Sequence, residues 1–302
     1  MPLLAKSLPL MAELCCDGME YVNVGAIRIP KIGLGTFPMK GDVLAKSISE
    51  AYNSGYRLFD TAYKYKNESE LVDSLKEKSA NCIIQTKFSV TQLSYKKFLW
   101  FKYDKKTMDD ALDGSMKRLG THCLDVYLLH APSKGYMEYF GSLLRYKEQN
   151  KVKVAGVCRF NEKQLQDIKD VHGVFPELNQ IEIHPYHSNK KLVDFCKKQG
   201  IKVEARSIFT HGDALDSLMQ SEVLRKIAAD CGKTVPQVIL RWIVQQGLIA
   251  IVKAEHPQHI KDNIDVFDFY LTAQQMGMID SMDKNESFGC VSNKLGNNGK
   301  CN

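Results

Sequence analysis

The fold is decided by a pattern that is complete in residues 107–130, TMDDALDGSMKRLGTHCLDVYLLH. The first half has apolar residues at helical spacing and begins with Thr107 and Asp110, which are spaced like a capping box. Gly120 is a typical helix end, and the apolar run 124–130 that follows has the length of a buried strand. The stretch therefore predicts a helix that leads directly into a buried strand.

The same alternation of β-rich runs and amphipathic segments extends through the chain. We predict a hairpin at 20–29, a helix that opens at Asp42, and a helix capped by Thr234 with Gly247 at its end. Eight strands are predicted, at KIGLGT (31–36), YRLFDT (56–61), CIIQTKF (82–88), LDVYLLH (124–130), VKVAGV (152–157), LNQIEIH (178–184), IKVEARS (201–207) and LIAIVK (248–253). Eight strand–helix units in about 250 residues favour an α/β fold, a single closed (β/α)8 TIM barrel, over an open sheet.

The 302 residues contain no linker, low-complexity tract or internal repeat that would divide this barrel. We expect an N-terminal extension at 1–19, the barrel at 20–283, and a polar C-terminal tail at 284–302. The apolar opening stretch is interrupted by Lys6 and Glu13, so we expect neither a signal peptide nor a membrane span. The nine cysteines form no C-x-x-C pair, which argues against a disulfide framework and a zinc site and favours the cytoplasm.

The net charge of +6 is concentrated in residues 91–106, where five lysines accompany one aspartate among several aromatic residues. Such a segment could stack on bases and bind phosphates. No basic stripe recurs elsewhere, so we interpret the segment as a surface loop and expect no nucleic-acid partner.

Polar residues at the carboxyl ends of the predicted strands are the candidates for chemistry, because barrel enzymes place their active sites there. A nearby ammonium favours the phenolate form of a tyrosine, so Lys87 could lower the pKa of Tyr65. Asp60 is placed to keep a buried Lys87 charged, and His130 could donate a hydrogen bond to a substrate oxygen. The set describes a general acid with tuning groups and contains no nucleophile.

Six motifs match a known family in order and spacing. They are DTAYKYKNE (60–68), QTKF (85–88), LDVYLLHAP (124–132), GVCRFN (156–161), NQIEIHPY (179–186) and IVKAEHPQHIKDN (251–263). Over residues 20–283 the chain thereby resembles the aldo-keto reductases, oxidoreductases that reduce aldehydes and ketones. The resemblance implies that Tyr65 is the proton donor and that Asp60, Lys87 and His130 complete a catalytic tetrad.

The resemblance also implies a nicotinamide cofactor bound without a Rossmann fold. The sequence agrees, since GLGTFP (33–38) has Pro38 where the third glycine of a dinucleotide fingerprint would stand. We expect NADPH in preference to NADH. The implied cofactor contacts are Thr36, Cys158, Arg159, Gln180, Arg206, Ser207, Lys253, His259, Asp262 and Asn263.

Several of these positions depart from the family pattern. The 2′-phosphate is gripped in the family by Lys, Ser and Arg, and these positions here are Lys253, Ala254 and His259. Pro257 suits the first turn of a helix whose free N–H groups would attract an anion. A metal pair at His256 and His259 lacks a further ligand, so no metal site is expected.

The nicotinamide contacts also differ. The usual Ser-Asn pair is Cys158 and Arg159, Gln180 is intact, and Arg206 replaces a stacking tyrosine. A guanidinium would oppose the positive charge of the oxidised cofactor, so we hypothesise that Arg206 favours carbonyl reduction.

The substrate pocket is expected to contain Phe37, Tyr63, Phe88 and Ala131, where many relatives carry Trp in place of alanine. The segment 91–106 could act as a lid, and its lysines leave an anionic carbonyl substrate open. We expect a monomer that acts on a small carbonyl compound.

Two other functions remain open. Channel β subunits resemble this family and can carry Arg at the position of Arg159, so a cofactor-binding regulatory or redox-sensing subunit with weak turnover is the alternative. A barrel glycosidase would need Asp60 and Glu182 both free, whereas Lys87 is expected to occupy Asp60.

Overall fold

The computed structural model describes residues 18–90 and 105–288. The centre of the molecule is a closed barrel of eight parallel strands in the order β10-β3-β4-β5-β6-β7-β8-β9. The strands are β3 (Ile32–Gly35), β4 (Leu58–Asp60), β5 (Ile83–Phe88), β6 (Leu124–Leu129), β7 (Val152–Cys158), β8 (Leu178–Glu182), β9 (Lys202–Arg206) and β10 (Ile249–Val252). All eight predicted strands are present, and the predicted TIM barrel is confirmed.

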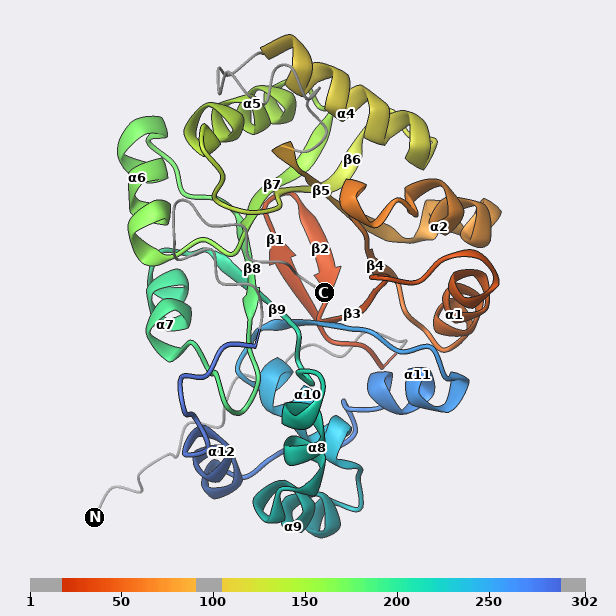
Figure 1. Ribbon diagram of the computed structural model, residues 1–302, viewed down its shortest axis with the longest axis vertical. Helices are drawn as coiled ribbons and strands as arrows, with labels where there is room; N and C mark the ends of the chain where they lie inside the picture. The colour runs from red at the N-terminus through yellow and green to blue at the C-terminus, as the bar shows by residue number, and fades with distance from the viewer. Residues whose placement is uncertain (1–17, 91–104, 289–302) are drawn as a thin grey trace, which may run out of the picture.

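Helices surround the barrel on its outside (Figure 1). They are α1 (Gly41–Asn53), α2 (Glu68–Leu75), α4 (Lys105–Leu119), α5 (Tyr136–Glu148), α6 (Glu162–His172), α7 (Lys190–Lys198), α8 (Asp213–Gln220), α9 (Glu222–Cys231), α10 (Val235–Gln245), α11 (Pro257–Ile264) and α12 (Ala273–Asp280), with the 3-10 turns η1 (Tyr63–Tyr65) and η2 (Lys76–Asn81). Among the described residues, none of these helices has the length and apolar character needed to cross a bilayer.

One of the predicted helix starts is confirmed and another is wrong. Thr234 forms a capping box with Gln237 at the start of α10, as the sequence predicts. The capping box at Thr107 is wrong, because α4 already begins at Lys105 and Thr107 lies within its first turn. The helix therefore begins two residues before its predicted start.

The predicted hairpin closes one end of the barrel. Strands β1 (Tyr21–Val24) and β2 (Ile27–Pro30) pair antiparallel and lie across the centre of the barrel in Figure 1. Val24 and Ile29 share one apolar cluster with barrel-interior residues, several of which are the first residues of their strands: Leu58, Leu178 and Ile249. The hairpin therefore seals the amino-terminal end, and the carboxyl ends of the strands form the mouth.

The barrel interior is packed closely around Gly156 in β7. A methyl group added at this residue would lie 2.6 Å from Leu128 Cδ2 and 2.8 Å from the backbone oxygen of Leu178. The backbone oxygen cannot rotate away as a flexible side chain could. Close packing of this kind leaves no space for an added carbon.

We predict that Gly156→Ala lowers the free energy of unfolding by about 1–3 kcal/mol, the usual cost of overpacking. Gly277→Ala is the matched control, because nothing lies within 4 Å of that added methyl group in α12. The control is expected to gain about 0.5–1 kcal/mol from helix propensity. Urea unfolding measures both changes, and equal midpoints for Gly156→Ala and the wild type would contradict the prediction.

Candidate active site

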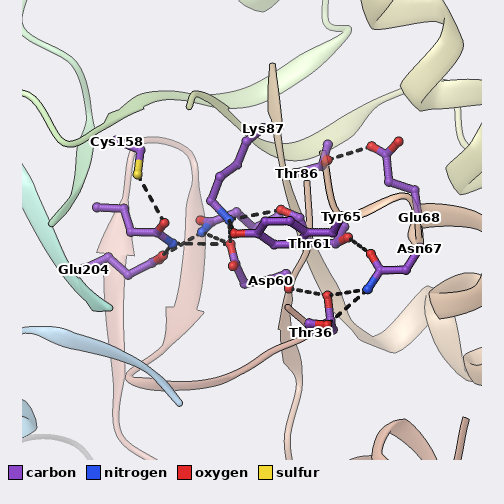
Figure 2. Close-up of polar contacts among 12 residues, drawn as sticks. Thr36, Asp60, Thr61, Tyr65, Asn67, Glu68, Thr86, Lys87, Cys158 and Glu204 are labelled. Carbon is purple, nitrogen blue, oxygen red and sulfur yellow. Dashed lines mark hydrogen bonds and ion pairs between the residues drawn. The ribbon is translucent and has the colours of Figure 1, made fainter. Parts of the chain in front are cut away.

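Four polar residues meet at the mouth of the barrel, where the sequence places them. Asp60 is the last residue of β4, Lys87 lies in β5, His130 follows β6, and Tyr65 ends η1. Lys87 Nζ forms an ion pair with the Asp60 carboxylate, donates to the Thr61 carbonyl oxygen at 3.0 Å, and lies 3.5 Å from Tyr65 Oη (Figure 2). The rings of Tyr65 and His130 meet edge to face with centroids 5.8 Å apart.

The electrostatics of Lys87 and Tyr65 are set by burial and by their neighbours. Burial alone would lower the pKa of Lys87, but the Asp60 carboxylate holds it above its ordinary value. Lys87 therefore stays an ammonium at neutral pH. The expected lowering of the Tyr65 pKa is wrong as a net effect, because burial raises this pKa and outweighs the opposing charge of Lys87. Tyr65 is thus a protonated donor beside a fixed cation.

His130 is a neutral imidazole. Burial and the charges of Lys87, Arg159, Lys64 and Arg206 lower its pKa to about 2. A neutral ring cannot act as the general acid at physiological pH, but its N–H can still donate a hydrogen bond. Proton delivery therefore falls to Tyr65, and His130 is suited to orient an oxygen.

A second carboxylate, Glu204 in β9, lies beside Asp60 inside the barrel. Gln85 Nε2 donates to Asp60 Oδ1 at 2.7 Å and to Glu204 Oε1 at 2.6 Å. Gln180 Nε2 donates to the same two carboxylates. Burial and the Asp60 charge raise the pKa of Glu204 above its ordinary value of 4.5, although the two amides oppose this. Two amide groups thus hold the two acids together.

Gln85 and Glu204 are not among the residues predicted for the site, although the sequence contains a signal for both. Successive side chains of a strand point to opposite faces, so residues two apart share a face. Gln85 stands two residues before Lys87 in β5, and Glu204 stands two residues before Arg206 in β9. A polar residue inside an otherwise apolar strand, two residues before a cation near the end of that strand, therefore points to this network.

We predict that wild type loses stability relative to Glu204→Gln as pH rises above 4.5. A carboxyl group whose pKa is raised in the folded state stabilises it when protonated, and this contribution is lost as pH increases. Urea unfolding from about pH 5 to about pH 8 measures the difference between the two proteins. Glu148→Gln, which removes an exposed carboxylate from α5, is the matched control. A difference for Glu204→Gln that is the same at every pH would contradict the prediction.

Glu182, at the end of β8, is occupied by other groups. It accepts hydrogen bonds from Ser287 Oγ and the Phe288 backbone N–H, each at 2.7 Å, and contacts His184 at 3.1 Å. Burial opposes the effect, yet these bonds lower the pKa of Glu182 to about 2. A glycosidase acid needs a raised pKa, and Asp60 is paired with Lys87, so the arrangement does not suit glycoside hydrolysis.

The first residues of the predicted tail contact the barrel. Lys284 and Glu286 donate their backbone N–H groups to the Tyr186 carbonyl oxygen at 3.1 Å. Residues 284–288 therefore pack on the barrel, while 289–302 lie outside the described residues, as does nearly all of the segment 91–106.

The predicted nicotinamide contacts gather on the opposite side of the mouth. Cys158 Sγ donates to Gln180 Oε1 at 3.4 Å, and both residues are buried. Arg159 and Ser207, which follow β7 and β9, have left-handed backbones with φ of 69° and 52°. Such conformations are uncommon outside glycine and occur often at functional sites. Arg206 Nη1 donates to Ser207 Oγ at 3.0 Å.

The predicted phosphate-binding residues lie around the start of α11. This helix begins at Pro257, as predicted, and His256 caps it by accepting from the Gln258 backbone N–H at 3.3 Å. Lys253 pairs with Glu255 at 2.5 Å and is 45% exposed, so its charge is available at the surface. The rings of His256 and His259 have centroids 5.1 Å apart. Asp262 accepts from Gln258, and Asn263 is buried.

Two of the predicted site residues, Phe88 and Thr36, are buried. Phe88 is 2% exposed and packs its ring on Tyr139 at 5.0 Å, because strand alternation turns it away from the face that carries Lys87. It belongs to the outer core and does not line the pocket. Thr36 is fully buried, and its hydroxyl donates to the Asp60 carbonyl oxygen at 2.9 Å, so it supports the end of β4, while its contact to a cofactor stays a prediction.

The other predicted pocket residues lie near the tetrad. Phe37 is 58% exposed, with its ring 5.0 Å from that of Tyr65. Tyr63 lies on η1 under the guanidinium of Arg118, and Ala131 directly follows His130. An exposed aromatic ring next to the tyrosine hydroxyl is suited to contact an organic substrate.

A family model decides the identity of this barrel. The model of the aldo/keto reductase family matches residues 31–284, which include all four tetrad residues. The chain belongs to the aldo-keto reductase family. It is therefore an oxidoreductase of a family that binds a nicotinamide cofactor.

Individual relatives cover most of this aldo-keto reductase. The glyoxal reductase of Bacillus subtilis is 34% identical over 265 residues, covering 87% of this chain and 92% of that protein. The methylglyoxal reductase DkgA of Escherichia coli is 32% identical over 264 residues, covering 86% and 92%. A crystal structure of a Gox0644 mutant in complex with NADPH has a TM-score of 0.79 and 32% identity, covering 88% of this chain and 94% of that one.

Proposed function

We propose that this aldo-keto reductase reduces an aldehyde or ketone to an alcohol with NADPH as the reductant and Tyr65 as the proton donor. The observation that carries the proposal is the arrangement of Tyr65, Lys87, Asp60 and His130 at one mouth. The relatives named glyoxal reductase and methylglyoxal reductase support a small carbonyl substrate.

The chain offers fitting groups for the cofactor. Arg159 Nε, Arg206 Nε and His130 Nδ1 are buried without a hydrogen-bond partner among the described residues. Within the described residues Gln180 Oε1 accepts the Cys158 thiol and keeps a lone pair for an amide N–H. The start of α11, with Lys253 and His259 nearby, suits a phosphate. The related NADPH complex supports NADPH over NADH. When bound, NADPH supplies the hydride.

Each tetrad residue has a role that follows from its surroundings. Tyr65 Oη holds the proton that the carbonyl oxygen receives. Neutral His130 directs that oxygen by a hydrogen bond. Lys87, kept charged by Asp60, stabilises the phenolate left on Tyr65 after the proton has moved. The raised pKa of Tyr65 keeps its proton in place until a substrate is bound.

A regulatory or redox-sensing subunit is the second candidate. The observation that favours it is the cationic Arg159, held in a left-handed backbone where the family has asparagine. Turnover distinguishes the two, since a sensor would bind NADPH and oxidise it only slowly with every aldehyde or ketone tested.

Tyr65→Phe is predicted to lower kcat by about 10²–10⁴-fold, the usual contribution of a positioned general acid. NADPH binding is expected to persist, because the phenol is not needed to hold the cofactor. Loss of NADPH absorbance with a panel of small aldehydes measures turnover, and fluorescence titration measures the Kd. Full activity in this variant would refute the assignment of Tyr65.

Arg206→Tyr is predicted to shift the preference between the two cofactor forms. A guanidinium beside the nicotinamide disfavours the oxidised form, so the ratio of Kd for NADP⁺ to Kd for NADPH is expected to fall in the variant. Titration of both forms with both proteins measures the ratio. An unchanged ratio would end this hypothesis.

A further inference from the structure

The segment that carries Tyr65 is closed by a hydrogen bond between its two ends. Asn67 is buried, and its Oδ1 accepts from Thr61 Oγ1 at 2.6 Å (Figure 2). Thr61 directly follows β4 and Asn67 directly precedes α2, so this bond joins the ends of the segment 61–67. Inside the segment, the Tyr65 backbone N–H donates to the Ala62 carbonyl oxygen at 2.9 Å. The position of Tyr65 therefore depends on a closed loop of seven residues.

The amide of Asn67 also holds the neighbouring loop, which follows β3. Its Nδ2 donates to the Met39 carbonyl oxygen at 3.0 Å and to the Thr36 carbonyl oxygen at 3.1 Å. Thr36 and Met39 flank Phe37, whose exposed ring lies 5.0 Å from that of Tyr65. One buried side chain therefore connects the loop of the proposed proton donor to the loop of the aromatic ring beside it.

The usual role of an asparagine at this position does not account for these bonds. Asn67 is the N-cap residue of α2, where an asparagine side chain normally accepts from a backbone N–H of the first turn. Among the described residues, its side chain makes no such bond. The amide has two N–H donors and one carbonyl oxygen, and the two loops use all of them. The side chain therefore serves the mouth of the barrel and not the start of the helix.

The start of α2 is anchored separately by the next residue. Glu68 is buried, and it accepts from Thr86 Oγ1 at 2.7 Å and from Arg118 Nε at 2.6 Å (Figure 2 shows the first of these bonds). The two bonds tie the helix to β5 and to α4. Loss of the Asn67 bonds would therefore act on the two loops and not on the attachment of α2.

We propose that Asn67 is a positioning residue, which holds the Tyr65 hydroxyl in place for proton transfer without touching the substrate. This inference rests on the proposed function and adds a residue on which that function depends. Lys87 Nζ donates to the Thr61 carbonyl oxygen at 3.0 Å and lies 3.5 Å from Tyr65 Oη. Thr61 is therefore held by Lys87 through its carbonyl oxygen and by Asn67 through its hydroxyl. A displacement of about 1 Å at a reacting group can lower a rate by about 10²-fold.

Thr61→Val is the first test variant, because valine matches threonine in shape and lacks the hydroxyl. The bond to Asn67 Oδ1 is lost, whereas the bonds from Nδ2 to the loop 36–39 remain. With benzaldehyde, butanal and glyceraldehyde as substrates, we expect kcat to fall by about 10-fold to 10²-fold with little change in KM. Thr61→Ser keeps the hydroxyl and is expected to restore most of this kcat. Fluorescence titration with NADPH counts the cofactor-binding sites, so kcat is expressed per site and unfolded protein does not affect it.

Asn67→Ala releases both loops, and Thr121→Val serves as the matched control. In Asn67→Ala we expect kcat to fall at least as far as in Thr61→Val, and KM for benzaldehyde to rise because the ring of Phe37 is no longer held. The Thr121 hydroxyl donates to the Cys123 carbonyl oxygen at 2.9 Å directly before β6, at the opposite end of the barrel. Loss of that bond is expected to leave kcat and KM unchanged.

Hydrogen exchange gives a measurement that does not depend on turnover. The backbone N–H groups of Tyr65 and Lys66 bond to carbonyl oxygens of their own segment at 2.9 and 3.1 Å, so their exchange reports its opening. We expect faster exchange of the segment 61–67 in Thr61→Val and in Asn67→Ala than in the wild type. Thr121→Val is expected to exchange there like the wild type.

A kcat per site in Thr61→Val equal to that of the wild type would overturn the inference while leaving carbonyl reduction intact. An equal loss of kcat in Thr61→Ser would overturn it as well, because the hydroxyl would then not be the cause. Unchanged hydrogen exchange of the segment 61–67 in both Thr61→Val and Asn67→Ala would have the same consequence. A wild type that reduces none of the three aldehydes would refute the proposed function itself, on which the inference rests.

Discussion

The arrangement of the mouth depends on the buried ion pair between Lys87 and Asp60. A lysine that is fully buried would lose its charge without an anion, and a lone buried carboxylate would do the same. The pairing of β4 with β5 brings the two residues together, and the packed barrel gives neither a second position. Removal of Asp60 would leave an uncompensated ammonium beneath Tyr65. Both the packing of the barrel around Lys87 and the proposed proton transfer from Tyr65 therefore depend on this ion pair.

The charged groups of the barrel interior lie at different depths below the mouth. Glu204 lies deepest and has a raised pKa, Asp60 and Lys87 compensate one another above it, and Lys64, Arg159 and Arg206 lie around the rim. The amides of Gln85 and Gln180 connect the lower two levels, which couples the geometry of Asp60 to that of Glu204. Gln180 also contacts Cys158, so one glutamine links the acid network to the predicted nicotinamide side.

The sequence predicts the barrel and the tetrad well because both depend on local patterns. Strand length, strand alternation and the residue that ends each strand place Asp60, Lys87 and His130 at one mouth before any contact is known. The position of a residue near the end of a strand does not say which face of the sheet its side chain occupies. For this reason Phe88 was wrongly predicted to line the pocket, and Glu204 was not predicted at all. The net pKa of Tyr65 depends on the depth of burial, a property of the assembled barrel that no local pattern contains. The sequence predicts that Lys87 acts to lower the pKa of Tyr65. It does not predict that burial raises this pKa by more than Lys87 lowers it.

The neutrality of His130 connects the rim to the reaction. The neighbouring cations, Lys87 first among them, lower the pKa of this histidine in addition to burial, so it donates a hydrogen bond and leaves Tyr65 as the acid. Burial is the largest cause of the low pKa and keeps the ring neutral. The proton therefore stays on Tyr65, and the hydrogen-bonding role of His130 follows first from its burial and then from the charges around it.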